Sequence, residues 1–235
     1  MNLQRRVLVT GGGTGLGLGI VEALLYAGTE VVAVGRRAEP LTAAAALGAR
    51  TFPYDVTEDP DQLLDLAGPL DGLVHNAAVY VHGAHDQWRA EDWRRQWQIN
   101  VLAPAMLSRA FVARSTGPGA IVAISSTLAR RPAIGATPYA TTKAALIALV
   151  QGLALELGPR RIRVNAVLPG VVPTPMTDAP RGEIDPAVQT TGFAQLHALG
   201  RMGTPAEVAE VVLTALGNPW MTGAALTIDG GLSIK

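Results

Sequence analysis

A cluster of glycines directly after the first apolar run constrains the fold of this chain more than any other feature. The run Val7–Thr10 predicts a short buried strand, and Leu16–Ala27 predicts a helix that ends at Gly28. Between them, the stretch Gly11–Gly17 holds five glycines. Glycines let the backbone turn tightly from a strand into a helix and let an anionic group approach the helix N-terminus. This unit therefore predicts an α/β fold that binds a phosphate-containing nucleotide.

The rest of the chain alternates short β-branched runs with longer helical patterns. This alternation predicts a parallel sheet with helices on both faces, and strands that are apolar throughout agree with burial on both sides. We expect one domain over residues 1–235: an α/β fold with a Rossmann-like, doubly wound parallel β-sheet flanked by helices on both faces. The further predicted strands are Glu30–Val34, Ala49–Pro53, Gly72–His75, Ala120–Ser125, Arg163–Val167 and Ala225–Ile228, and the further predicted helices are Leu41–Leu47, Glu91–Ala113, Pro138–Leu157 and Pro205–Leu216.

One long stretch does not follow this alternation. Residues 173–200 are rich in turn formers and have weak periodicity. A long irregular segment in a compact enzyme is usually a lid or a binding loop. We therefore expect a mobile substrate-loop segment at about residues 173–200.

Composition excludes several kinds of partner and site. The chain has 19 basic and 19 acidic residues, so nothing favours nucleic acid or an anionic membrane surface. It has no cysteine, and His82 and His85 have no third ligand at a suitable spacing, so we expect no metal. No uncharged apolar run reaches the roughly 18 residues that span a bilayer, and the first strand leaves no room for a signal peptide. We expect a cytoplasmic protein.

The spacing of the glycines and the end of the second strand indicate which nucleotide binds. The loop fits Gly11-x-x-x-Gly15-x-Gly17, whereas Leu16-Gly17 excludes the Lys-Ser/Thr pair of a nucleoside-triphosphate loop. An acidic residue after the second strand would bind a ribose 2′-hydroxyl. This chain instead has Arg36 and Arg37 there, and arginine pairs well with a phosphate. The sequence therefore favours NADP(H) over NAD(H).

A serine, a tyrosine and a lysine supply the predicted chemistry. Lysine occurs only at Lys143 and Lys235, and Lys143 follows Tyr139 by four residues, so the two share one helix face. A free tyrosine has a pKa of about 10, and a nearby ammonium favours the phenolate and lowers this pKa. With Ser126 upstream, the trio predicts a tyrosine acid/base, a lysine that tunes its pKa and a serine that hydrogen-bonds a substrate oxygen.

The order of these motifs resembles the short-chain dehydrogenase/reductase family over Val7 to Gly231. The matching motifs are Thr10-Gly11-x-x-x-Gly15-x-Gly17, Asp55-Val56, Asn76-Ala77-Ala78, Asn100, the set of Ser126, Tyr139 and Lys143, Pro169-Gly170 followed by Thr174, and Asp229-Gly230-Gly231. The chain departs from the family pattern at His75 and Ala78, where asparagine and glycine are usual. We expect these departures to affect packing near the cofactor.

The resemblance implies an NAD(P)H-dependent oxidoreductase that interconverts an alcohol and a ketone or aldehyde. It implies hydride transfer at the nicotinamide, proton transfer by the tyrosine, and a lysine that also bonds the nicotinamide ribose. The implied catalytic residues are Asn100, Ser126, Tyr139 and Lys143. The implied cofactor-binding residues are Gly11, Gly13, Thr14, Gly15, Leu16, Gly17, Arg36, Asp55, Val56, Asn76, Ala77, Ala78, Tyr139, Lys143, Pro169, Gly170, Val172 and Thr174.

Pro104 follows Asn100 by four residues in the same predicted helix. Proline has no N–H, so the usual bond to the carbonyl of Asn100 cannot form. In the family, this carbonyl is thought to hold a water that relays protons to the lysine. We hypothesise that Pro104 helps to expose the carbonyl for this role, against the alternative of a kink that only adjusts packing.

The nature of the substrate stays open. A 3-oxoacyl-[acyl-carrier-protein] reductase would need a basic docking patch, for which Arg130 and Arg131 are candidates, and a sugar or polyol dehydrogenase fits equally well. A catalytically inactive dinucleotide-binding regulator is the alternative from another class. We expect the substrate to be a small-molecule alcohol or carbonyl, with specificity in residues 173–200 and in Tyr80, Leu128 and Ala133.

The second half of the helix Pro138–Leu157 is apolar nearly all round, so it must be buried on more than one side. One side can cover the sheet, and the other needs a partner. We expect a homo-oligomer, and the family resemblance implies a tetramer formed through these helices.

Overall fold

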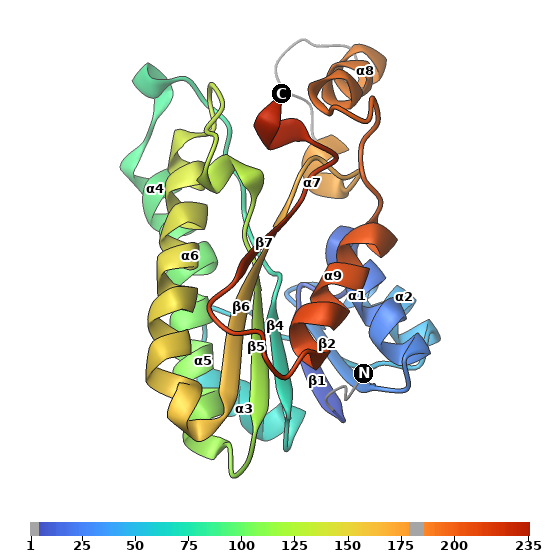
Figure 1. Ribbon diagram of the computed structural model, residues 1–235, viewed down its shortest axis with the longest axis vertical. Helices are drawn as coiled ribbons and strands as arrows, with labels where there is room; N and C mark the ends of the chain where they lie inside the picture. Colours follow the sequence, from blue (N-terminus) through green and yellow to red (C-terminus); the bar gives the residue numbers. More distant parts are fainter. Residues whose placement is uncertain (1–4, 179–185) are drawn as a thin grey trace.

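Seven parallel strands form one sheet, as the sequence predicted (Figure 1). The computed structural model describes residues 5–178 and 186–235. The strands are β1 (Arg6–Thr10), β2 (Glu30–Gly35), β3 (Arg50–Pro53), β4 (Gly72–His75), β5 (Gly119–Ile124), β6 (Ile162–Pro169) and β7 (Ala225–Ile228). Val9 of β1 pairs in register with Ala33 of β2 on one side and with Val74 of β4 on the other.

The strand order places a topological switch point between β1 and β4. The order is β3-β2-β1-β4-β5-β6-β7. Strands β2 and β3 are therefore added on one side of β1, and β4 to β7 on the other side. In open α/β sheets, ligands bind beyond the carboxyl ends of the strands at such a point. Thr10 and His75 are the last residues of the two strands that flank it.

Helices cover both faces of the sheet (Figure 1). One face is covered by α1 (Gly15–Tyr26), α2 (Ala38–Ala46) and α9 (Pro205–Gly217), and the other by α3 (Pro60–Ala67), α4 (Ala90–Trp97), α5 (Ala103–Arg114) and α6 (Thr137–Leu157). Neighbouring strand residues point into opposite cores: Leu8 packs with α3, α5 and α6, whereas Val7 and Val9 pack with α1 and α9. This alternation explains why the strands are apolar at every position.

The predicted helix Glu91–Ala113 is in fact three consecutive helical segments. Between α4 and α5 lies η2 (Gln98–Leu102), a π-helical turn in which the N–H of Ala103 donates to the carbonyl of Gln98. Pro104 stands in the first turn of α5, directly after this wider turn. A π-helical turn lets the chain pass a residue that cannot donate to the ordinary helical partner, and such turns are frequent at functional sites.

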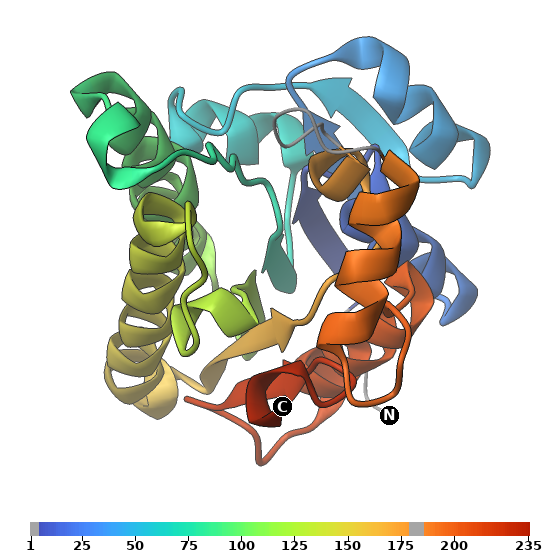
Figure 2. The ribbon, with the colours of Figure 1, turned by 90° about the horizontal axis from the view of Figure 1, so that it is seen from above.

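Residues 173–200 contain more regular structure than the sequence predicted. The structure places α7 (Pro175–Asp178) and α8 (Pro186–Leu196) there, while residues 179–185 lie outside the described part. Viewed from above the carboxyl edge of the sheet, α8 lies beside the C-terminal segment (Figure 2). The predicted mobility of this segment stays a prediction.

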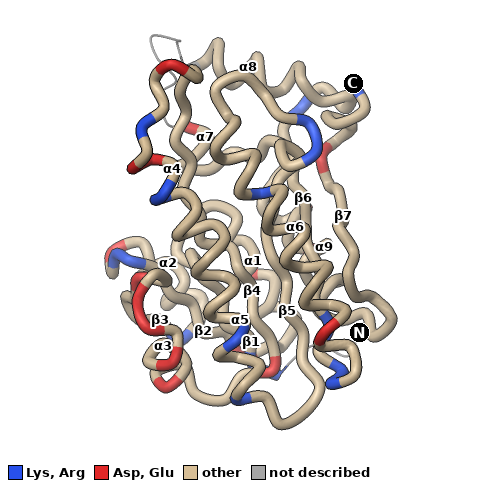
Figure 3. Tube along the Cα trace, turned by 90° about the vertical axis from the view of Figure 1, so that its left-hand side faces the viewer, with Lys and Arg blue, Asp and Glu red and all other residues tan. Residues whose placement is uncertain are grey.

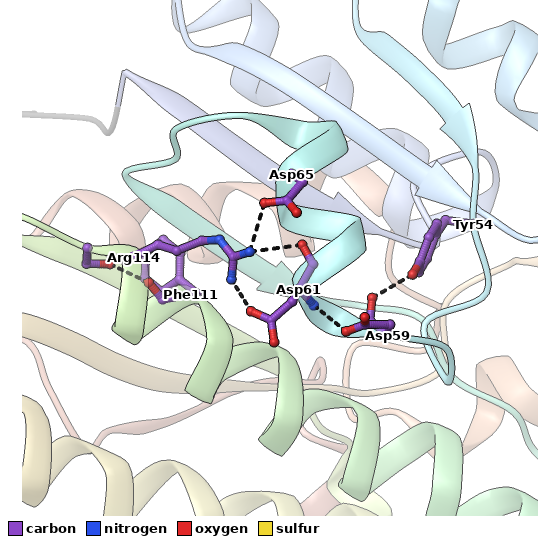
Figure 4. A network of polar contacts seen from close by, with 7 residues as sticks. Tyr54, Asp59, Asp61, Asp65, Phe111 and Arg114 are labelled. Carbon is purple, nitrogen blue, oxygen red and sulfur yellow. Dashed lines mark hydrogen bonds and ion pairs between the residues drawn. The ribbon is translucent and has the colours of Figure 1, made fainter.

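Helix α3 was not predicted; its buried Leu63 and Leu64 pack into the core, and its exposed side makes charged contacts. The Asp59 side chain caps its N-terminus by accepting from the N–H of Asp61. Arg114 at the end of α5 pairs with Asp61 and with Asp65, the latter at 2.8 Å (Figure 4). These pairs are exposed, so each contributes little stability. Short helical turns complete the described chain: η1 (His85–Gln87), η3 (Thr127–Ala129), η4 (Gly158–Arg160) and η5 (Leu232–Ile234).

Helix α6 passes along the outside of the sheet with few charges, as Figure 3 shows. By length and composition alone, residues Thr137–Arg160 are apolar enough to cross a membrane, but 39% of the 18-residue window that meets this test is buried inside the protein. Leu146, Val150 and Ala154 pack into the core, whereas Leu155 is 83% exposed. A core helix explains the first three residues but leaves the exposed face without a partner in the described chain.

Candidate active site

A cavity of about 750 Å³ extends along the carboxyl edge of the sheet, at the switch point between β1 and β4. Its size is typical of a cofactor or ligand site. Every predicted cofactor-binding residue lines it, from Gly11 of the glycine stretch to Thr174 after β6, and so do Ser126, Tyr139 and Lys143. Of the predicted catalytic residues, Asn100 alone does not line it. Tyr80, Leu128 and Ala133, the predicted specificity residues, also line it, whereas His85 does not.

The glycine stretch is packed so closely that a side chain would disrupt it. A Cβ on Gly17 would lie 2.0 Å from the carbonyl oxygen of Gly11 and 2.5 Å from Nδ2 of Asn76. Gly11 itself has φ +66°, a backbone conformation that residues with a side chain rarely adopt. The glycines therefore allow α1 to start directly against the end of β1.

Asn76 and Thr10 join the ends of β4 and β1 across the switch point. Asn76 Nδ2 donates to the carbonyl of Thr10 at 3.0 Å and to that of Gly11 at 3.1 Å. Thr10 Oγ1 accepts from the N–H groups of Asn76 and Ala77, both at 3.1 Å. The side chain of Asn76 thus holds the glycine stretch in place.

The N-terminus of α1 faces the cavity with donors to spare. Thr14 is its N-cap residue but makes no side-chain capping bond, and the first turn has no acidic residue. The first N–H groups of a helix have no partner within the helix, so they suit a phosphate. Arg36 and Arg37 line the same end, where β2 stops at Gly35. These donors fit a dinucleotide that carries several phosphates.

The segment after β6 closes over this end of the cavity. A Cβ on Gly15 would lie 2.9 Å from Cγ2 of Thr174, so Thr174 lies directly against the glycine stretch. Asp55 forms a compact turn after β3, where Oδ1 accepts from the N–H of Thr57 at 3.0 Å and from its hydroxyl at 2.8 Å. We call this part of the cavity, lined by residues 11–17, Arg36, Asp55 and Val56, the glycine-loop end.

Tyr139, Lys143 and Ser126 line the same cavity. Tyr139 and Lys143 lie on α6 and are only 9% and 2% exposed. Lys143 Nζ lies 5.4 Å from the centre of the Tyr139 ring and donates to the carbonyl of Ile124 at 2.7 Å. Ser126 follows β5, and its Oγ accepts from the N–H of Leu128 at 3.1 Å. The structure therefore brings the predicted trio together.

Burial changes the acidity of both ionisable groups of the trio. It lowers the pKa of Lys143 to about 7, because an ammonium loses hydration there. Burial, together with the nearby Tyr80, raises the pKa of Tyr139 above its ordinary value. The expectation of a lowered tyrosine pKa is therefore wrong for this arrangement. The physical reason is that the loss of hydration destabilises the phenolate more than Lys143 stabilises it. Burial also disfavours the charged form of Lys143, which weakens this stabilisation.

Hydrogen bonds from two sides fix Lys143 in its position. Ser125 Oγ donates to the backbone carbonyl of Lys143 at 2.8 Å, and Lys143 Nζ donates to the carbonyl of Ile124, the last residue of β5. Thr142 Oγ1 donates to the carbonyl of Tyr139 at 2.7 Å and accepts from Asn100 Nδ2 at 3.0 Å. Sequence reasoning missed Ser125 and Thr142, because only the packing of α6 on β5 shows which backbone groups they reach.

Asn100 lies behind the cavity, with its side chain fully used. It is 1% exposed, and it exchanges two bonds of 2.9 Å with the backbone of Val79, the Oδ1 atom accepting and Nδ2 donating. The side chain of Asn100 thus joins the chain after β4 to α6. The predicted role of its carbonyl in a proton relay stays a prediction.

The substitution of histidine at position 75 affects packing away from the cavity. His75 is 5% exposed, and its Nε2 lies 2.8 Å from Oγ of Ser108 on α5. Burial lowers the pKa of His75 to about 3, so the ring is neutral at physiological pH. His75 therefore replaces the usual asparagine as a core residue between β4 and α5. Ala78, the second departure, does line the cavity.

The other end of the cavity is built from segments far apart in the sequence. His197 is 1% exposed; its Nε2 accepts from the N–H of Val171 at 3.1 Å, and its Nδ1 lies 2.8 Å from the carbonyl of Phe193. Lys235 Nζ donates to the carbonyl of Gln195 at 2.6 Å. We call this part, lined by Tyr80, Leu128, residues 131–133, Phe193, Gln195, Leu196, Leu232 and Lys235, the α8 end.

No candidate metal site was found in the part of the chain that the structure describes. Over residues 5–178 and 186–235, no three histidine, aspartate or glutamate side chains gather closely enough to hold an ion. His82 instead packs under the loop at Gly135, whose added Cβ would lie 2.3 Å from His82 Nε2.

A doubly wound parallel sheet with a glycine loop and a Ser–Tyr–Lys set in one cavity defines a dinucleotide-dependent oxidoreductase. A family model described as enoyl-(acyl carrier protein) reductase matches residues 11–233. The chain belongs to the short-chain dehydrogenase/reductase family, whose members are NAD(P)-dependent dehydrogenases and reductases.

Similar proteins cover nearly the whole chain. The L-xylulose reductase of Homo sapiens is 37% identical over 97% of this chain and 96% of its own length. A 3-alpha-(or 20-beta)-hydroxysteroid dehydrogenase of Mycobacterium tuberculosis is 33% identical over 95% of this chain and 87% of its own length. Among solved structures, a blue fluorescent protein from a metagenomic library in complex with NADPH matches with a TM-score of 0.89 and 31% identity, covering 99% of both chains.

Proposed function

We propose that this protein reduces the carbonyl group of a small or medium-sized molecule with NADPH, using Tyr139 as the acid. One observation carries the proposal: the glycine stretch, Ser126, Tyr139 and Lys143 all line a single cavity. The NADPH found in the similar metagenomic protein supports the choice of cofactor.

The residues present fit a dinucleotide along the length of the cavity. The α1 N-terminus would bind the pyrophosphate, and Asp55 and Val56 would lie beside the adenine. Lys143 would bond the nicotinamide ribose, and Pro169, Gly170 and Val172 would flank the nicotinamide. The bound cofactor supplies the hydride, and the protein decides where the substrate carbon and the proton donor lie.

The protonation states of Tyr139 and Lys143 suit the reduction of a carbonyl group. Because burial raises the pKa of Tyr139, this residue is a neutral phenol at physiological pH. Tyr139 would give its phenolic proton to the oxygen of the substrate carbonyl, while Ser126 would donate a hydrogen bond to the same oxygen. Lys143, with a pKa of about 7, can return a proton to the phenolate. The carbonyl of Asn100 would connect this lysine to solvent through water.

A preference for NADPH over NADH follows from the arginines at the end of β2. Arg36 and Arg37 line the cavity, and neither forms an ion pair with a carboxylate of the described residues. An arginine–phosphate bond at this position would select the 2′-phosphate of NADPH. We expect Arg36→Ala to weaken NADPH binding about tenfold, by loss of one charge-assisted bond, and to leave NADH binding unchanged. Equal affinities for both cofactors in the unaltered protein would remove the argument.

Two more specific activities compete for the same cavity. Reduction of a sugar to a polyol, or the reverse oxidation, is favoured by the similarity to L-xylulose reductase. Reduction of a 3-oxoacyl group on a carrier protein is favoured only by the description of the matching family model. A regulator without catalysis would not need Tyr139 and Lys143 buried beside Ser126. A panel of ketoses, ketones and acyl thioesters distinguishes the three.

The experiment that tests the proposal measures NADPH oxidation with this panel. We expect at least one carbonyl compound to be reduced, and Tyr139→Phe to lower kcat by about 10²–10⁴-fold while NADPH still binds. Tyr26→Phe is the matched control and should leave kcat unchanged, because Tyr26 is 95% exposed and does not line the cavity. A fully active Tyr139→Phe variant would show that the assignment is wrong.

We also propose that the protein works as a cytoplasmic homotetramer. The exposed apolar face of α6, including Leu155 at 83% exposure, supports assembly through this helix. Light scattering at micromolar concentration should give about four times the mass of the chain. A monomer under those conditions would contradict the proposal.

A further inference from the structure

Two cationic side chains stand at the α8 end of the cavity. Arg131 follows Ser126 by five residues, and Lys235 comes from the C-terminal segment; both line the cavity, and both residues are exposed. Neither belongs to the glycine-loop end, where the α1 N-terminus would bind the phosphates of a cofactor. Their charge therefore requires an explanation other than the cofactor.

Neither cation is neutralised within the described chain. Arg131 Nη1 donates to the carbonyl of Leu232, and Lys235 Nζ donates to the carbonyls of Gln195 and His197, at 2.6 and 3.4 Å. No ion pair joins either side chain to a carboxylate of the described residues. Backbone carbonyls hold both side chains in place but use only part of their donors, since arginine has five N–H groups and lysine has three.

The neighbouring arginine shows that this placement is specific. Arg130 does not line the cavity; its guanidinium donates to Thr227 Oγ1 at 3.3 Å and to the carbonyl of Ala225 at 3.5 Å. Two adjacent arginines thus point to different surroundings, one on the outside of β7 and one at the cavity. A docking patch for an acidic carrier protein would use both on one surface, which this arrangement does not favour.

The other side chains that line the α8 end carry no charge, and apart from Tyr80 and Gln195 they are apolar. Its described lining includes Leu128, Pro132, Ala133, Phe193, Leu196 and Leu232. Asp55 is the one acidic residue among the described residues that line the cavity, and it belongs to the glycine-loop end. A molecule held here would therefore meet an apolar wall between the reaction centre and two positive charges.

We propose that the substrate carries an anionic group, a carboxylate or a phosphate, which binds Arg131 and Lys235 while its carbonyl lies beside Ser126 and Tyr139. Carboxylates and phosphates match the donor geometry of a guanidinium, and an ammonium adds a point charge. This inference rests on the proposed carbonyl reduction and narrows its substrate class. Because both cations are exposed, solvent and salt will screen the interaction.

Matched substrate pairs test the inference. Dihydroxyacetone phosphate is compared with dihydroxyacetone, and 4-oxopentanoate with its methyl ester, each by NADPH oxidation at low and high sodium chloride. We expect the anionic member of at least one pair to have a kcat/KM about tenfold higher, with the advantage shrinking as salt screens it. Which pair shows the advantage distinguishes a phosphate from a carboxylate.

Variants separate charge at the cavity from charge in general. Arg131→Gln and Lys235→Gln should each lower kcat/KM for the anionic member several-fold, up to about tenfold, and leave the neutral member unchanged. Arg130→Gln removes the same charge from the adjacent position outside the cavity and should change neither. If the neutral members are preferred, or if Arg131→Gln and Arg130→Gln act alike, the anionic substrate is excluded while carbonyl reduction stands. If none of these four compounds and no compound of the wider panel is reduced, the proposed function fails and this inference with it.

Discussion

The two ends of the cavity are built in different ways. At the glycine-loop end, residues 11–17 join one strand to the next helix, and the N-terminus of α1 lines the cavity. At the α8 end, side chains and carbonyls from separate segments meet: Lys235 donates to the carbonyl of Gln195, Arg131 donates to that of Leu232, and His197 behind them accepts from the N–H of Val171. The first end depends on local backbone conformation, and the second depends on long-range contacts.

This difference explains why one protein family can keep its cofactor and change its substrate. A backbone cradle tolerates few substitutions, because an added side chain meets main-chain atoms that cannot move. A surface assembled from side chains can change one residue at a time without disturbing the sheet. The comparison is open to direct test, since the chain offers the same kind of substitution at both ends.

The largest difference between the two ends should come from adding one methyl group to a glycine. In Gly17→Ala, the new Cβ would lie 2.0 Å from a backbone oxygen, so α1 or β1 must shift. We expect NADPH affinity to fall by at least about tenfold and the free energy of unfolding to fall by about 1–3 kcal/mol. Fluorescence titration and urea denaturation measure the two quantities.

Gly192→Ala is the matched control at the α8 end. Gly192 lies within α8, and its added Cβ meets nothing within 4 Å. Alanine is a better helix former than glycine by up to about 1 kcal/mol, so stability should stay the same or rise slightly, with NADPH binding unchanged. Equal losses of NADPH affinity and of stability in Gly17→Ala and Gly192→Ala would show that both ends are equally sensitive to an added methyl group. That result would contradict the proposed difference between the two ends.

The second prediction concerns Lys143, which lies where the two ends meet. Burial lowers its pKa to about 7, whereas an unfolded lysine titrates near 10.4. Between these values the unfolded chain binds a proton that the folded chain does not, so the free energy of unfolding rises with pH, by at most about 1.4 kcal/mol per pH unit. Below about pH 7 both states are protonated, and this contribution is constant. The raised pKa of Tyr139 acts only above about pH 10, outside this window.

Urea denaturation of the cofactor-free protein at about pH 7.5 and about pH 9.5 measures this slope. Lys143→Met keeps a long apolar side chain and removes the titrating group, so its stability should rise less over the same interval. Parallel pH dependences in the two proteins would mean that Lys143 keeps its ordinary pKa when folded.

A smaller effect is expected at His197, whose ring connects α8 to the strand that ends at Pro169. In His197→Leu, the half-buried N–H of Val171 loses its acceptor, which costs about 1 kcal/mol. We expect a higher KM for the carbonyl substrate and an unchanged Kd for NADPH, because only the α8 end is loosened. His197→Gln can present an oxygen to Val171 and should recover part of both losses. A Kd for NADPH that changes as much as KM would show that the bond between His197 and Val171 stabilises the whole cavity.

The sequence by itself determined the sheet, the glycine stretch at the end of its first strand, and the set of Ser126, Tyr139 and Lys143 that the cavity brings together. These follow from local periodicity, from glycines at a strand–helix junction and from the helical spacing of Tyr139 and Lys143, all of which act over a few residues. It did not predict helix α3, the π-helical turn at Asn100, or the helices within residues 173–200, where tertiary packing outweighs weak local preferences.

Only the tertiary structure decided the electrostatics of the site and the composition of its α8 end. The acidities of Tyr139 and Lys143 depend on how much water the surrounding core removes, and spacing along a helix carries no information about burial. In the same way, Arg130 and Arg131 are equivalent as neighbours in a sequence, and they differ because one faces β7 and the other faces the cavity. Proximity in space between residues a hundred positions apart is a property of the folded chain, and the chemistry at that end of the cavity depends on it.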